Sequence, residues 1–70
     1  MYKNFEEAKA AALNVIERNY NGDKMHCVIT ETKLTPRTNR RIWGFHFNDT
    51  DTNGEFVKTE NGAYERRYAI

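Results

Sequence analysis

The sequence has few of the residues that build disulfide frameworks and metal centres. Among 70 residues it has one cysteine, one proline and two histidines. The single cysteine, Cys27, excludes an internal disulfide and suits a reducing compartment. No run of 18 apolar residues is present, and residues 1–7 lack the apolar stretch of a signal peptide. These absences predict a soluble, cytoplasmic protein with no membrane as a partner.

An excess of charge of one sign is also missing. The chain has eleven Lys and Arg residues and ten Asp and Glu residues, a net charge of +1. Such a balance creates no long-range field that would attract polyanions. A chain of this length buries only about 60% of its unfolded surface. We therefore expect one domain over 1–70 with a thin core and no deep substrate cavity, which argues against an enzyme.

The first segment has the pattern of an amphipathic helix. Asn4 followed by Glu7 is a capping-box arrangement, in which the Asn side chain accepts a hydrogen bond from the N–H of Glu7. Apolar residues then recur at helical spacing, and Asn21-Gly22-Asp23 supplies a stop. The pattern predicts a helix over 5–20 with one apolar stripe, formed by Phe5, Ala8, Ala12, Val15, Ile16 and Tyr20.

The rest of the chain has β character, because Val, Ile, Thr and aromatic residues alternate between polar turns. Trp43, Phe45 and Phe47 share one face of a strand, which the helix stripe would cover. The predicted fold class is α+β, with an N-terminal helix packed on one face of a three- to four-stranded antiparallel β-meander. The predicted strands cover residues 25–34, 41–48, 55–60 and 63–69.

The last two predicted strands form a hairpin. Asn61-Gly62 is the strongest short-range hairpin signal in the sequence. A two-residue turn at this position would place Lys58 opposite Glu65. The charge pair across the strands would support that register.

The segment from Asp49 to Glu60 matches the spacing of an EF-hand calcium loop. Oxygen ligands at alternate positions suit a hard cation, and Gly54 occupies the sixth position. However, Asn61-Gly62 would break the exiting helix, and the preceding segment alternates like a strand. An acidic hairpin loop is the favoured interpretation, so no cofactor is expected. Calcium is the alternative, with Asp49, Asp51, Asn53, Glu55 and Glu60 as ligands.

The sequence offers no set of side chains suited to nucleophilic catalysis. His26 and Cys27 are adjacent in a predicted strand, so their side chains point to opposite faces. His46 could approach Cys27 from the next strand, but no third group is identified that would orient it. Two histidines and one cysteine also lack the number and spacing of zinc ligands. We therefore expect no catalytic residues.

Basic residues gather around the first predicted β-turn and on the last predicted strand. Together with tyrosines they offer the charge and the stacking surface that single-stranded nucleic acid requires. Interleaved acidic residues, including Glu31, Glu55 and Glu65, favour an ordinary solvated surface over a nucleic-acid site. Arg and Tyr also anchor protein interfaces, and we favour that use. The basic residues are Lys33, Arg37, Arg40, Arg41, Arg66 and Arg67, beside Tyr64, Tyr68 or His46.

Two stretches, Trp43-Gly44-Phe45-His46-Phe47 and residues 56–64 (FVKTENGAY), resemble the central signatures of a small bacterial immunity-protein family. In that family an N-terminal helix precedes a strand with Trp and Phe and then a hairpin with Val, Lys and Gly. The resemblance covers the helix and both signatures in order. It implies an αβββ fold and a role in neutralising a partner toxin, and it assigns no individual binding residues.

These observations lead to the hypothesis of a small non-catalytic protein of bacterial or phage origin that binds another protein and inhibits or neutralises it. Nucleic-acid binding is the first alternative, and a calcium-binding loop is the second. Homodimerisation through an edge strand is also open, since a small meander leaves two edges unpaired. The expected partner-binding residues are Arg37, Arg40, Arg41, Asp49, Asp51, Tyr64, Arg66 and Tyr68.

Overall fold

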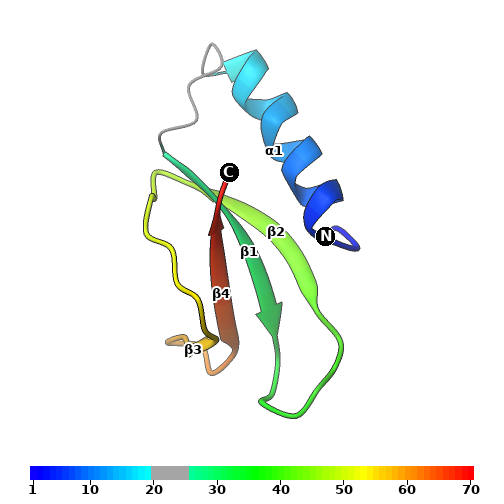
Figure 1. Cartoon of the computed structure of the whole chain (residues 1–70), viewed down its shortest axis with the longest axis vertical. Helices are drawn as coiled ribbons and strands as arrows, with labels where there is room; N and C mark the ends of the chain where they lie inside the picture. Colours follow the sequence, from blue (N-terminus) through cyan, green and yellow to red (C-terminus); the bar gives the residue numbers. More distant parts are fainter. Residues whose placement is uncertain (20–25) are drawn as a thin grey trace.

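The computed structural model describes residues 1–19 and 26–70, and these residues form a helix that packs against an antiparallel sheet (Figure 1). The predicted α+β fold class is therefore confirmed. Tyr20, the predicted stop at 21–23 and residue 25 of the first predicted strand lie outside the described residues. The elements are α1 (Phe5–Asn19), β1 (Cys27–Lys33), β2 (Ile42–Phe47), β3 (Val57–Lys58) and β4 (Tyr64–Ala69).

The strand order is β2-β1-β4-β3, which corrects the predicted meander. Strand β4 pairs with β1, so the connection between β2 and β3 passes from one edge of the sheet to the other. The central place of β1 follows from its composition. Cys27, Val28 and Ile29 are all buried, and three consecutive buried residues require cover on both faces and a strand on each side.

The helix buries a narrow stripe of small and branched residues against the sheet. Ala8, Ala12 and Ile16 are the buried residues of α1, and they form one cluster with Cys27 and Ile29. The alanines leave room for a close approach of helix and sheet. Within the described part of the chain, no helix has the length and apolar character needed to cross a membrane.

The start of α1 is capped as predicted. The N–H of Glu7 donates to Oδ1 of Asn4 at 2.9 Å, and Oε1 of Glu7 accepts from the N–H of Lys3 at 3.3 Å. Two N–H groups that have no partner inside the helix are thereby satisfied. The cap also connects the helix to the residues that precede it.

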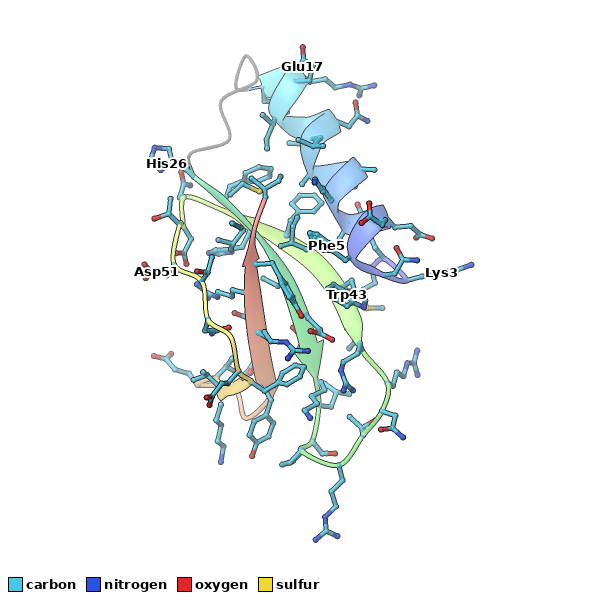
Figure 2. The ribbon with its side chains drawn as sticks, viewed as in Figure 1. Lys3, Phe5, Glu17, His26, Trp43 and Asp51 are labelled. Carbon is cyan, nitrogen blue, oxygen red and sulfur yellow. The ribbon has the colours of Figure 1, made fainter. Side chains whose placement is uncertain are left out.

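The predicted aromatic face is confirmed, because Trp43, Phe45 and Phe47 pack against the helix cluster. The rings of Phe5 and Trp43 meet edge to face with centroids 6.2 Å apart (Figure 2). The helix lies over one end of the sheet, while the loop between β1 and β2 extends past the other end (Figure 1). The sheet face on the helix side therefore has a covered part and an open part.

The β3–β4 hairpin has a register one residue away from the predicted one. Val57 pairs with Glu65 and Lys58 with Tyr64, so the predicted Lys58–Glu65 pair is wrong. The turn holds three residues, because the N–H of Thr59 donates to the carbonyl of Ala63. Gly62 has a φ of 89°, which matches a type I turn followed by a glycine bulge.

Both edges of the sheet are partly covered within residues 1–19 and 26–70. At the β2 edge, the N–H of Tyr2 donates to the carbonyl of Trp43 at 3.1 Å. At the β4 edge, Asn53 donates its N–H to the carbonyl of Arg67 and accepts the Arg67 N–H on Oδ1, at 3.2 and 2.7 Å. These bonds extend the edge cover that the short β3 begins. Homodimerisation through an edge strand stays a prediction.

Candidate functional site: a basic face built on a buried glutamate

Glu31 is a charged residue at the centre of the sheet and only 5% exposed. It lies on β1 between β2 and β4, on the same face as Cys27 and Ile29. A buried carboxylate is costly unless it is paired and hydrogen-bonded. Its partners must therefore come from the two neighbouring strands.

Three side chains meet that requirement. Arg66 on β4 places Nε and Nη2 each 2.9 Å from Oε1 of Glu31. Nε of Arg41, the residue before β2, lies 3.2 Å from Oε2, and the hydroxyl of Tyr68 donates to Oε1. Within the described residues, no buried side-chain nitrogen or oxygen is without a hydrogen-bond partner.

The partners decide the ionisation of this carboxyl. Burial acts to raise the pKa of Glu31, but the hydrogen bonds from Tyr68 and Arg66 and the charges of Arg66 and Arg41 outweigh it, so the pKa is lowered. The pKa of Tyr68 is raised by burial and by its bond to the carboxylate. Glu31 is therefore an anion that holds two guanidinium groups in place.

Phe56 lies next to these arginines and is engaged by three cations. Nζ of Lys33 is 4.4 Å from the ring centroid, and the Cζ atoms of Arg66 and Arg41 are 4.5 and 5.2 Å from it. Each contact is an attraction between a positive charge and the ring face. We name Lys33, Arg41, Phe56 and Arg66 the arginine–phenylalanine patch.

The patch is partly open to solvent. The side chains of Arg41 and Arg66 are 28% and 32% exposed, and Lys33 is half-buried. It lies where the sheet extends beyond the helix, and Tyr64 pairs with Lys33 at its border. The positive charges thus remain accessible while their positions are held.

Acidic and basic residues lie on both faces of the sheet, in agreement with the predicted interleaving, but Glu31 and Glu65 are each paired with arginine. Alternation along β4 places Arg66 and Tyr68 on the helix side and Glu65 and Arg67 on the other. Glu65 pairs with Arg67 on that opposite face, and Glu31 is buried beneath the arginines. Neither carboxylate is therefore an exposed acidic neighbour within the basic patch.

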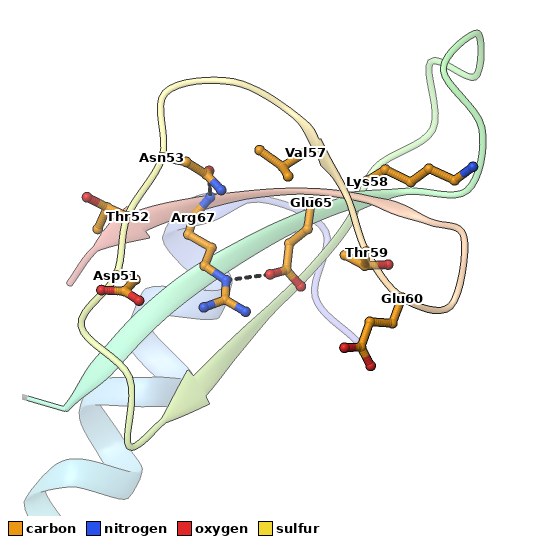
Figure 3. A pocket seen from close by; sticks show the side chains of 9 residues that line it. All are labelled: Asp51, Thr52, Asn53, Val57, Lys58, Thr59, Glu60, Glu65 and Arg67. Atoms are coloured by element: carbon orange, nitrogen blue, oxygen red, sulfur yellow. Dashed lines mark hydrogen bonds and ion pairs between the residues drawn. The ribbon is translucent and has the colours of Figure 1, made fainter.

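The opposite face has a shallow groove of about 360 Å³ (Figure 3). Arg67 lies at its centre and binds Glu65 and Asp49, so its charge is compensated. The pKa of Asp49 is lowered, first by a hydrogen bond from the N–H of Asp51 and then by Arg67. The groove is lined by Asp51, Thr52, Asn53, Val57, Lys58, Thr59, Glu60, Glu65 and Arg67.

The predicted calcium ligands belong largely to this groove. Asp49 and Asn53 use their oxygens for Arg67, and Glu60 lies in the β3–β4 turn. Strands flank the loop, as predicted, but β2 and β3 lie at opposite edges of the sheet, so the loop is a crossover connection and the predicted hairpin loop is wrong. Among residues 1–19 and 26–70, no group of three or more His, Cys, Asp or Glu side chains is placed to hold a metal ion. Calcium binding stays a prediction.

The predicted partner-binding residues divide into three groups. Arg41, Arg66 and Tyr68 meet around Glu31, with Tyr64 at the border of the patch. Arg37 and Arg40 lie in the loop between β1 and β2, whereas Asp49 and Asp51 lie on the opposite face.

Sequence reasoning missed the central roles of Glu31 and Phe56. Glu31 counted as an exposed acid, although alternation places it on the same face of its strand as Cys27 and Ile29, and that was a signal of burial. Phe56 is a single large apolar residue in a polar segment, and that isolation was the available signal.

The residues considered for catalysis do not converge. Cys27 pairs with Phe47, and Val28 pairs with His46, so alternation places His46 on the face opposite Cys27. This corrects the expectation that His46 could approach the thiol. Burial raises the pKa of Cys27, a shift that a backbone hydrogen bond at His46 partly offsets.

Comparisons with models of protein families, with curated proteins and with solved structures find no match for this chain.

Proposed function

We propose that the chain is a non-catalytic binding protein, of the inhibitor or immunity type, that holds an acidic segment of a partner protein against the arginine–phenylalanine patch. The observation that supports this proposal is the convergence of Lys33, Arg41 and Arg66 on the ring of Phe56. The patch gathers positive charge on one face although the net charge of the chain is only +1. An acidic segment is the complementary partner.

The geometry lowers the cost of binding such a segment. Glu31 holds Arg66 through Nε and Nη2, and Arg41 is held by Glu31 and by the carbonyl of Thr38, which accepts from Nη1 at 2.9 Å. A guanidinium has five N–H donors, so each arginine retains donors for a carboxylate. Side chains that are already ordered lose less entropy when a partner binds.

Nucleic-acid binding is the second candidate, and the same arginines favour it. Single-stranded nucleic acid also needs free ring faces on which bases stack. The Phe56 ring is engaged by three cations, and Trp43 and Tyr68 stack on each other with centroids 5.8 Å apart. These three rings are thus engaged within the domain, which favours a protein partner, whereas Tyr64 at the border of the patch has no such ring contact with any described residue.

The test is affinity capture from bacterial lysate with the tagged chain, with and without nuclease. Three forms are compared: wild type, Lys33→Glu in the patch, and Arg37→Glu in the exposed loop between β1 and β2, a predicted binding residue that this proposal leaves outside the site. The two variants change the net charge by the same amount. Circular dichroism first confirms that each variant is folded.

We expect a protein partner in near-equal amount that survives nuclease, is lost with Lys33→Glu and is retained with Arg37→Glu. Loss of the captured material after nuclease would instead support nucleic-acid binding. Equal capture by wild type and Lys33→Glu would remove the patch from the binding site.

A further inference from the structure

A second basic hollow lies where the N-terminal residues meet the start of β2. It has a volume of about 350 Å³ and adjoins the arginine–phenylalanine patch, because Arg41 belongs to both. We name it the N-terminal pocket. Its lining residues are Met1, Tyr2, Lys3, Arg40, Arg41 and Ile42.

Backbone contacts hold the two sides of this pocket in place. The N–H of Tyr2 donates to the carbonyl of Trp43, and the ring of Tyr2 stacks on Phe45 with centroids 5.9 Å apart. The next N–H, of Lys3, is bound to the Glu7 carboxylate at the start of α1. The N-terminal residues are therefore fixed to both the sheet and the helix.

The other side of the pocket is the end of the β1–β2 loop. The N–H of Arg40 donates to Oγ1 of Thr38 at 3.3 Å, and Arg41 is held by Thr38 and Glu31. These contacts order the backbone at Arg40 and the guanidinium of Arg41. The pocket thus exists before any ligand binds.

The lining is half cationic and half apolar. Lys3, Arg40 and Arg41 supply three positive charges, and none of the six lining residues is acidic. No ion pair is formed by Lys3 or Arg40 with any residue in 1–19 and 26–70, and the Lys3 side chain points away from the sheet (Figure 2). Tyr2 and Ile42 supply apolar surface beside these charges.

We infer that the N-terminal pocket binds a glutamate side chain of the same acidic segment, an inference that rests on the proposed function. A glutamate has an aliphatic stem and an anionic tip, so it matches both halves of the lining. A bare phosphate would leave the surface of Tyr2 and Ile42 unused. Arg41 belongs to both surfaces and precedes the edge strand β2, so we expect one extended segment that passes around this edge to reach both.

The test is a ¹⁵N NMR titration with capped hexaglutamate as the probe. Capped hexaaspartate, inorganic phosphate and a six-residue oligo-dT are titrated in parallel at one fixed salt concentration. Four forms are compared: wild type, Arg40→Glu in the pocket alone, Lys33→Glu in the patch alone, and Arg37→Glu in neither. All three variants change the net charge equally, and Lys3→Glu provides a second change in the pocket.

We expect saturable shifts at the amides of Lys3 and Ile42 with hexaglutamate, and weaker binding of the other three probes. Arg40→Glu and Lys3→Glu should each weaken hexaglutamate about tenfold, and Arg37→Glu less than about twofold. Oligo-dT or phosphate that binds as tightly as hexaglutamate would overturn the inference.

Two outcomes separate this inference from the proposed function. If Lys33→Glu weakens binding but Arg40→Glu behaves like Arg37→Glu, the pocket is not part of the site and the patch stands. If Arg40→Glu weakens binding but Lys33→Glu does not, one segment does not span both surfaces and the proposed role of the patch fails.

Discussion

Arg66 places two nitrogens, Nε and Nη2, each 2.9 Å from the same carboxylate oxygen of Glu31, a residue 35 positions earlier in the chain. The two residues pair directly across β1 and β4. The contact therefore joins the central strand to the C-terminal strand through a buried charge. It also orders the arginine that the proposed binding site uses.

The first prediction concerns the buried charge itself. Glu31→Gln should lower the free energy of unfolding by about 1–3 kcal/mol, because Arg41 and Arg66 lose their anionic partner. Glu65→Gln is the matched control, and it should cost less than about 1 kcal/mol, because Arg67 retains Asp49. Urea unfolding measures both values. Equal losses of unfolding free energy in the two variants would show that burial does not make the contacts of Glu31 more stabilising than those of Glu65.

The second prediction is the pH dependence of that loss. The pKa of Glu31 lies below its ordinary value of 4.5 in the folded state, since the bonds from Tyr68 and Arg66 outweigh the effect of burial. A carboxyl with a lowered folded-state pKa stabilises the fold above its ordinary pKa. The stabilisation is lost as the pH falls from 4.5 through the lowered value.

The stability difference between wild type and Glu31→Gln should therefore narrow as the pH falls from about 6 to about 3. Urea unfolding at several pH values measures it. The lowered pKa of Asp49 affects both proteins, so its contribution cancels in the difference. A difference that stays constant over this range would contradict the assignment.

Local signals predicted the helix and three of the strands to within two residues, but the strand predicted over 55–60 is only Val57–Lys58. The Asn4–Glu7 cap gave the start of the helix, and the alternation of Trp43, Phe45 and Phe47 gave the face that the helix covers. Such signals depend on residues a few positions apart. The local structures that these signals predict are therefore also found in the folded protein.

Strand order and hairpin register depend on information that is not local. β1 lies at the centre because its three consecutive buried residues need a neighbouring strand on each side, and this depends on all the strands together. The glycine bulge at Gly62 adds a residue to the turn, which shifts every pair in the β3–β4 hairpin by one position. A turn motif alone does not distinguish these alternatives.

The candidate site could also be predicted only in part, because its residues are a local feature and their convergence is not. Arg41 and Arg66 were predicted as binding residues from their chemistry. Their convergence on Glu31 and Phe56 requires β2, β1 and β4 to lie in that order. A meander would separate β4 from β1, so the site could not be assembled from the predicted fold.

The third prediction tests the thin core. Ile29 is fully buried at the centre of the sheet. Ile29→Val should cost about 0.5–1.5 kcal/mol, and Ile29→Ala about 2–5 kcal/mol. A domain of this size has roughly 5 kcal/mol of stability in total, so the alanine variant should keep only about 0–3 kcal/mol and show a measurable unfolded population near the lower end. Urea unfolding measures the valine variant, and dispersion of NMR amide signals reports on the alanine variant. Similar stability of the two variants would show that the stability of the core does not depend on the Ile29 side chain.

The fourth prediction separates backbone strain from crowding at two glycines. An added Cβ would meet nothing within 4 Å at either Gly54 or Gly62, but only Gly62 has a left-handed φ, of 89°. Gly62→Ala should therefore destabilise the fold by about 1–2 kcal/mol, since an L side chain is strained in that conformation. Gly54→Ala should be neutral or stabilise by up to about 1 kcal/mol, because alanine restricts the unfolded chain more than glycine does. Thermal and urea unfolding of both variants provide the comparison. If Gly62→Ala proves as stable as Gly54→Ala, the turn does not need its glycine bulge, and the observed register of the hairpin must have another cause.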